Sequence, residues 1–143
     1  MSTLDTAIAA AGSALSAERV RLEASISNLA NAESTRGPDG QPYRRRNVVL
    51  SSAAVGTFDE ALGQASGAMG VQVAGIVEDQ SPPRRQYEPA HPDADAEGFV
   101  NLPNVDPAEE MVDMISAARA YQANLSAIGM IRDLVQRSLD VGK

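Results

Sequence analysis

Apolar residues recur at seven-residue spacing in two stretches, one near each end of the chain. The first repeat consists of Ile8, Leu15, Leu22 and Leu29. The second repeat consists of Met114, Tyr121, Ile128 and Val135. Residues seven apart lie on one side of an α-helix, and a strict repeat of this kind favours long helices that lie against one another with a slight supercoil. The pattern predicts a mainly α protein whose long N- and C-terminal helices pack as a coiled-coil-like pair.

Both stripes are wider than a single helix–helix seam. The additional apolar residues are Leu4, Ala11 and Ile26 in the first stretch, and Met111, Ile115, Ala118, Leu125, Ile131, Leu134 and Leu139 in the second. The two helices could simply pair with each other inside one molecule, and we expect that this holds in part. A face wider than one seam, however, implies more than one neighbour, and the chain has only 3% aromatic residues with which to cover it. We therefore predict that part of this surface is buried between molecules.

Capping and turn residues set the expected ends of the first helix. The helix should run from residue 3 to about residue 34, with Ser2 as its cap. The segment 36–42 follows, and it is dense in glycine, proline and aspartate, which form turns. This helix defines a first segment, residues 1–35.

The second helix has the clearest start signal in the chain. Asp106 is a candidate cap, Pro107 occupies the first helical position, and Glu109 occupies the capping-box position. The helix should run from about Pro107 to Val141. It defines a C-terminal segment, residues 106–143, and leaves 36–105 as a middle segment with loops and a small β element.

The middle segment is short and mixed in character. Residues 43–50 look like a strand, and β-branched content with partial alternation predicts another at 71–77. A further short strand is expected at 84–87, after Pro82 and Pro83. Residues 51–70 are rich in Ala, Gly and Ser and should form a loop, with a helical turn around Phe58–Leu62. The stretch Pro89–Gly98 should be extended and acidic.

A polar run, Ser27–Thr35, closes the first helix. One interpretation is an ordinary helix C-terminus, because Asn and Ser terminate helices well. The other is a polar junction at which Asn28, Asn31 and Thr35 fix the handover to the loop and contact a neighbouring subunit. The residues alone favour neither.

Arg44, Arg45 and Arg46 form a basic cluster in a chain whose net charge is −7. Such an acidic chain lacks the cationic footprint that nucleic acids or anionic membranes require, so neither is an expected partner. The cluster is either a solvated strand face or a rim that meets acidic patches on neighbouring subunits, such as Glu109 and Glu110. No apolar run approaches the ~20 residues that a membrane span needs.

The sequence offers little for catalysis or metal binding. It contains no cysteine and one histidine, His91, which lacks any nucleophile-elbow sequence around it. His91, Asp93, Asp95 and Glu97 would point to one side of an extended segment and could bind a hard cation. The alternative is an acidic loop in water, and we expect no cofactor, no metal and no enzyme activity.

Four segments resemble the axial proteins of the bacterial flagellum, the rod and hook family. They are SAERVRLEASISNLANAEST at 16–35, PYRRRNVV at 42–49, the middle segments 70–83 and 87–105, and EMVDMISAARAYQ at 110–122. The Asn-Leu-Ala-Asn signature at 28–31 is shared across the family, whereas the middle segments are most similar to proteins of the proximal rod. The resemblance covers nearly the whole chain except 51–69.

The resemblance implies a structural subunit of the proximal rod. The terminal helices would polymerise into a tubular drive shaft that transmits torque and encloses the export channel. Expected partners are copies of the chain, other rod proteins, the MS-ring and rod-adaptor proteins, and the type III export apparatus. The chain would be exported without a cleaved signal peptide to a rod that crosses the periplasm. The alternatives are another rod or hook subunit, a peptidoglycan hydrolase, and a cytoplasmic helical adaptor.

The expected subunit interface combines the two stripes, the polar junction and the basic cluster. Its residues are Ile8, Leu15, Leu22, Ile26, Asn28, Leu29, Asn31, Thr35, Arg44, Arg45, Met111, Met114, Ile115, Tyr121, Leu125, Ile128 and Val135.

Overall fold

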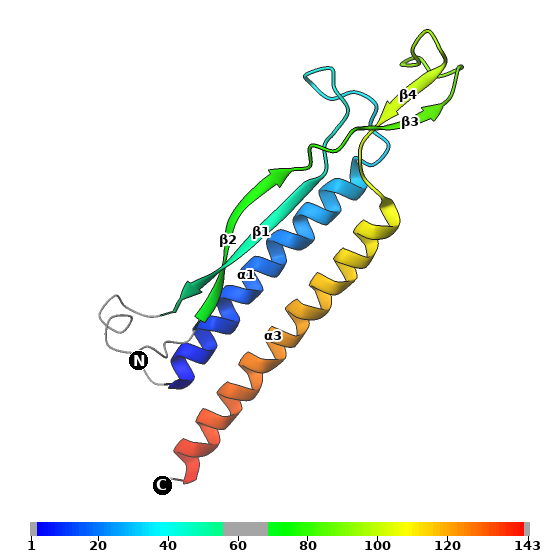
Figure 1. The fold of residues 1–143 in the computed structure, drawn as a ribbon. Helices are drawn as coiled ribbons and strands as arrows, with labels where there is room; N and C mark the ends of the chain where they lie inside the picture. Colours follow the sequence, from blue (N-terminus) through cyan, green and yellow to red (C-terminus); the bar gives the residue numbers. More distant parts are fainter. Residues whose placement is uncertain (1–2, 56–68, 142–143) are drawn as a thin grey trace.

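Two long helices and two small antiparallel sheets make up the fold in the computed structural model, which describes residues 3–55 and 69–141. The elements in chain order are α1 (Thr3–Ala30), β1 (Arg46–Ala54), β2 (Met69–Glu78), β3 (Arg84–Tyr87), β4 (Phe99–Leu102) and α3 (Pro107–Val141). The helices α1 and α3 run side by side in opposite directions (Figure 1). The protein is therefore mainly helical with a β element in the middle of the chain, as the sequence predicts.

Helix α1 lies in the middle of a layered arrangement. Helix α3 packs along one flank of α1, and the β1–β2 hairpin packs along another (Figure 1). The β3–β4 hairpin projects beyond the ends of the helices, near the C-terminal end of α1. Each outer layer is thus covered on one side only within a single molecule.

Each sheet is a two-stranded antiparallel ladder. In the first, β1 pairs with β2 from Arg46 opposite Glu78 to Ala54 opposite Met69, with a bulge between Val49 and Leu50. In the second, β3 pairs with β4, so that the rings of Tyr87 and Phe99 meet edge to face with centroids 5.3 Å apart.

The C-terminal helix was predicted correctly. Asp106 caps it, because its Oδ1 accepts the backbone N–H of Ala108 at 2.8 Å. The helix α1 ends four residues before the predicted end, at Ala30. Beyond that point the side chain of Asn31 donates to the carbonyl of Ser27, and the hydroxyl of Ser34 donates to the carbonyl of Asn31. These local bonds compete with the helix and replace it by a turn.

Three strands were predicted before β4, and three are present. The bounds of the first two differ from those predicted. The strand expected at 43–50 begins only at Arg46 and continues to Ala54, because the N–H of Arg45 donates to the side chain of Asn104. The strand at 71–77 is confirmed and extends by two residues before and one after, and 84–87 is confirmed. The expected turn at Phe58–Leu62 and the Ser2 cap lie outside the described residues.

The extended conformation predicted for Pro89–Gly98 is wrong. The N–H groups of His91, Ala94 and Gly98 each donate to a carbonyl three residues earlier, which folds the stretch into successive turns. The following strand, β4, was not predicted, since its four residues are too few to show a period.

Small side chains fill most of the contact between the layers. The buried apolar residues are Ala17, Ala24, Ala32, Val100, Leu102, Val105 and Ala117. Alanines let helix backbones approach closely but bury little apolar area each. A supercoil of α1 and α3 stays a prediction. Neither described helix is long and apolar enough to cross a membrane.

Gly98 tests the packing of the β3–β4 hairpin. Its φ is +84°, and a Cβ there would lie 2.9 Å from Cε2 of Tyr87 and 3.1 Å from Cβ of Pro89. We expect Gly98→Ala to lower the free energy of unfolding by about 1–3 kcal/mol, through backbone strain and overlap. Thermal or urea unfolding measures this. Gly129→Ala is the matched control: it has open space, lies in α3, and should stabilise by about 0.5–1 kcal/mol. Equal effects of the two substitutions would contradict the assignment.

Candidate functional site

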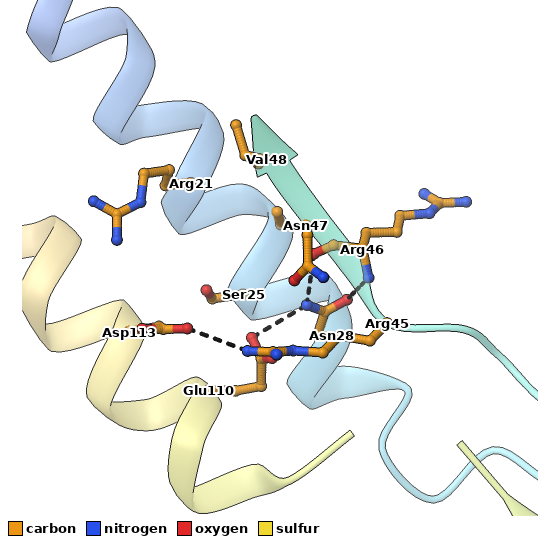
Figure 2. Close-up of a pocket in the computed structure, with 10 residues that line it drawn as sticks. Arg21, Ser25, Asn28, Arg45, Arg46, Asn47, Val48, Glu110 and Asp113 are labelled. Atoms are coloured by element: carbon orange, nitrogen blue, oxygen red, sulfur yellow. Dashed lines mark hydrogen bonds and ion pairs between the residues drawn. The ribbon is translucent and has the colours of Figure 1, made fainter. Parts of the chain in front are cut away.

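The side chain of Asn28 joins three elements at the C-terminal end of α1. Its Nδ2 donates to the carbonyl of Arg46 at 3.0 Å and to Oε2 of Glu110 at 3.1 Å. Its Oδ1 accepts the N–H of Arg46 at 2.9 Å and the hydroxyl of Tyr43 at 2.9 Å. All four hydrogen-bonding positions of the carboxamide are therefore used. Asn28 is only 1% exposed. Its amide bonds to both backbone groups of Arg46 at the start of β1, as a neighbouring strand would (Figure 2).

Glu110 brings a negative charge into the same site from the first turns of α3. Its carboxylate is 1% exposed, so the charge needs a partner. The Nε of Arg45 donates to Oε1 of Glu110 at 2.5 Å. The Nδ2 of Asn28 donates to the other carboxylate oxygen, Oε2. The guanidinium also lies 3.3 Å from Asp113 and 3.5 Å from Glu109. Arg45 thus forms ion pairs with three carboxylates of α3.

The backbone around Arg45 is fixed by a second asparagine. Oδ1 of Asn104 accepts the N–H of Arg45 at 3.0 Å, and its Nδ2 donates to the carbonyl of Asp79 at 3.3 Å. The N–H of Asp79 in turn donates to the carbonyl of Arg45 at 2.8 Å. Asn104 therefore bonds to the residue before β1 and to the residue after β2, and so fixes the open end of the hairpin against the segment that leads into α3.

The electrostatics of Arg45 keep it charged. Partial burial by itself lowers the pKa of Arg45, but the hydrogen bond to Glu110 and the negative charges of Glu110, Glu109 and Asp113 outweigh it. The net effect raises the pKa of Arg45 above its ordinary value. The guanidinium therefore stays charged, and the ion pairs depend on the ionisation of the carboxylates.

These residues surround a shallow recess of about 150 Å³ (Figure 2). Its lining is polar except for Ala24 and Val48. The charged groups at its floor already have partners inside the chain, so the recess lacks the free nucleophile, base or ligand set that chemistry requires. The arrangement is a structural joint, which we call the Asn28 joint: Asn28, Tyr43, Arg45, Asn104 and Glu110.

The acidic stretch around His91 does not form the predicted one-sided row. Nδ1 of His91 accepts the N–H of Asp93, and Asp93 is bound by Thr35 at 2.7 Å and by Arg36 at 2.9 Å. Asp95 and Glu97 instead pair with Arg85. Because the turns point these groups in different directions, the cation site suggested by the sequence pattern is not assembled. Among the described residues no group of three or more such ligands could hold a metal ion.

Hydrogen bonds from the backbone of the following residues also affect Asp95. The N–H of Phe99, which donates to Asp95 at 2.9 Å, lowers the pKa of this carboxyl, with smaller contributions from Glu97 and Arg85. Asp95 therefore stays ionised in the turn that leads into β4.

The predicted junction residues contact their own chain. Asn28 is enclosed by the Asn28 joint, Asn31 bonds back to Ser27, and Thr35 holds Asp93. Arg45, expected at a rim between subunits, meets Glu109 and Glu110 of the same molecule, because the hairpin and α3 converge at this point. Arg44 is exposed and donates to Gln80.

The predicted apolar interface residues separate into two groups. The half-buried group, covered within the molecule, comprises Ile8, Leu15, Leu22, Leu29, Met114, Tyr121, Ile128 and Val135. The exposed group comprises Ile26, Met111, Ile115 and Leu125. The two seven-residue repeats thus mark the sides that are partly covered inside one molecule, whereas the flanking residues mark open surface.

Tyr43, Asn104 and Asp113 were not predicted from the sequence. Tyr43 and Asn104 lie in loops without a period, and Asp113 resembles any acid on the solvated side of a helix. The polar run Ser27–Thr35 at the end of the first helix, which contains Asn28, was the signal that the sequence offered.

Comparison with known proteins identifies the family. Residues 96–141 match the family model described as "Flagellar basal body rod FlgEFG protein C-terminal". The chain is 47% identical over 133 residues to the flagellar basal-body rod protein FlgC of Salmonella typhimurium, covering 93% of both chains. It is 42% identical over 140 residues to FlgC of Bacillus subtilis, covering 92% of this chain and 93% of the relative. The chain belongs to the FlgC family.

The similarity extends to distant bacteria. FlgC of Borreliella burgdorferi is 38% identical over 152 residues, covering 96% of this chain and 97% of the relative. A member of the FlgC family is a structural subunit of the flagellar basal-body rod. In this context the Asn28 joint is part of a building block for an assembly.

Replacing Asn28 by aspartate tests the joint with almost no change of shape. The variant loses the donors to Arg46 and Glu110 and places a second carboxylate beside the first. We expect Asn28→Asp to lower the free energy of unfolding by about 3 kcal/mol or more, because both the unpaired groups and the like charges are buried. Denaturant unfolding followed by circular dichroism measures it. Asn47→Asp, an exposed neighbour, should change stability by less than about 0.5 kcal/mol.

A double-mutant cycle tests the ion pair. Arg45→Met leaves Glu110 buried without its cation, and we expect a cost of about 3–5 kcal/mol. Glu110→Leu in the same chain removes the stranded charge, so the double variant should be more stable than Arg45→Met alone by about 1–3 kcal/mol. Urea unfolding of the four proteins gives the coupling. Strictly additive effects would mean that the two charges do not depend on each other.

Proposed function

We propose that this chain is a non-enzymatic subunit of the proximal rod that polymerises through its two terminal helices. The rod so formed would transmit torque and enclose the export channel. Copies of this chain and other rod proteins would be its neighbours, with the MS-ring and rod-adaptor proteins at the base. Membership of the FlgC family supports the location, and the open surface of α3 supports the mode of assembly.

The observation that carries the proposal is the one-sided cover of α3. Large apolar side chains remain exposed along its whole length, and we call this set the α3 surface: Met111, Val112, Ile115, Leu125, Met130, Leu134 and Leu139. Their exposed fractions range from 46% at Leu125 to 66% at Val112 and Leu139. Exposed apolar residues in such number on one helix mark interaction sites, since leaving them in water is unfavourable.

The division of labour follows from this layout. The terminal segments 1–35 and 106–143 would supply the helical wall of the rod, and the middle segment 36–105 would hold the two helices in register. Travel through the type III export apparatus without a cleaved signal peptide, to a rod crossing the periplasm, is the route we propose for the chain. Enzyme activity is not part of the proposal, because the charged groups of the Asn28 joint are occupied by one another.

Mass spectrometry of purified hook–basal bodies tests the location. Peptides of this chain should be present in amounts comparable to those of other rod proteins. Their absence, with the chain left in the soluble fraction, would contradict the proposal.

A single charge on the α3 surface tests the mode of assembly. Leu125→Asp should leave the isolated chain folded, since Leu125 is 46% exposed, but should abolish rod assembly and swimming. The reason is that burying an unpaired carboxylate at each subunit contact costs several kcal/mol. Swimming assays and circular dichroism measure the two effects. Asn101→Asp, at an exposed residue of β4 away from α3, is the control for an added surface carboxylate and should swim normally.

A further inference from the structure

The side of the β1–β2 hairpin that does not face α1 carries a second exposed apolar set. We call it the hairpin surface: Met69, Val73 and Ile76, which the strand register places on the face opposite to that of Gly70, beside Ser13 of α1. Within one molecule α1 lies between this hairpin and α3, so the hairpin surface and the α3 surface lie on opposite sides of the same chain (Figure 1). Two different surfaces on opposite sides suit a head-to-tail contact, which repeats into a ring or a helix.

One register brings charged and apolar groups of the two surfaces together. From Glu78 to Val73 the strand β2 advances five residues, about 16 Å at roughly 3.3 Å per residue. From Arg119 to Met130 the helix α3 advances eleven residues, again about 16 Å at roughly 1.5 Å per residue. Val73 therefore falls opposite Met130 when Glu78 is placed beside Arg119. Because eleven residues are close to three helical turns, Arg119 and Met130 lie on the same side of α3.

Charge complements this register. Arg119 and Arg137 of α3 form no ion pair within residues 3–55 and 69–141, and both are exposed. The carboxylate of Glu78, at the end of the hairpin surface, is likewise exposed and has no cation within the same described ranges. Pairing Glu78 with Arg119 between molecules would fix the register more than the affinity.

We propose that the hairpin surface of one copy of this chain receives the α3 surface of a neighbouring copy, with Glu78 beside Arg119. This inference rests on the proposed function, because it specifies the contact through which the rod subunits assemble. Within one molecule Glu78 lies level with Glu110, because Arg46 pairs with Glu78 across the hairpin and Asn28 bonds to both Arg46 and Glu110. In the proposed contact Glu78 lies level with the neighbour's Arg119, nine helical residues further along α3. Neighbouring copies are therefore staggered by about 13 Å along the axis.

Engineered disulfides test the contact, because the chain contains no cysteine of its own. The in-register variant carries Val73→Cys and Met130→Cys, and the matched control carries Val73→Cys and Ile115→Cys, about 22 Å out of register. A disulfide needs Cα atoms within about 7 Å, and α1 separates the hairpin from α3 within one copy. Under oxidation in purified hook–basal bodies, the in-register variant should give covalent multimers at least five-fold above the control and above either single substitution.

The alternative outcomes overturn the inference. Equal cross-linking of the control, cross-linking of a single substitution to itself, or a covalent adduct with a different rod protein in place of multimers would each contradict the contact. So would a lack of multimers from an incorporated in-register variant. These results leave the proposed function standing. Absence of the wild-type chain from hook–basal bodies would instead contradict the proposed function.

Charge reversal gives a second measurement that does not depend on cysteine. Glu78→Arg and Arg119→Glu should each reduce swimming at least five-fold, and the two together should restore most of it. Normal swimming of both single variants would overturn the inference, as would a double variant no better than the singles. Glu97→Arg, an exposed acid of the β3–β4 hairpin, is the control for adding a positive charge at the surface.

Discussion

The carboxamide of Asn28 is the interaction on which the arrangement of this chain depends. It bonds to both backbone groups of Arg46 and to the carboxylate of Glu110, and so ties α1 to β1 and to α3 at one point. A slip of α3 by one turn would leave these groups buried and unpaired, at a cost of about 1–3 kcal/mol for each. The alanine-rich contact between the helices gives close approach but little preference for one register. The polar joint supplies the register that the small apolar core does not.

The same layout explains why the molecule is suited to assembly. With α1 in the middle, the hairpin and α3 each bury one side and leave apolar groups on the other. A single chain therefore satisfies its polar joint internally, while most of the large apolar side chains on α3 stay exposed. In the proposed rod the joint would hold each subunit in shape, and the exposed surfaces would supply the contacts between subunits. Membership of the FlgC family of rod proteins agrees with a chain built in this way.

Sequence periodicity predicted the parts of the fold that local rules control. The helix α3 was correct to the residue, because Asp106, Pro107 and the seven-residue repeat all act within a few turns. The predicted bounds of β1 and the extended conformation predicted for Pro89–Gly98 were wrong, since hydrogen bonds to particular side chains and carbonyls determine both segments. Asn28 was identified as a junction residue, but its partners lie 18 and 82 residues away in the chain. No local pattern could have paired it with Glu110, nor assigned Arg45 to its own chain and not to a neighbour.

The most direct test of the joint is hydrogen–deuterium exchange at the backbone amide of Arg46 in the wild-type protein. This N–H donates to Oδ1 of Asn28, at 2.9 Å. If the joint holds α1, β1 and α3 together, the amide of Arg46 should be protected as strongly as amides in the middle of α1 and should open together with them. Exchange of Arg46 at the rate of an unstructured peptide, while the helix amides stay protected, would contradict the account.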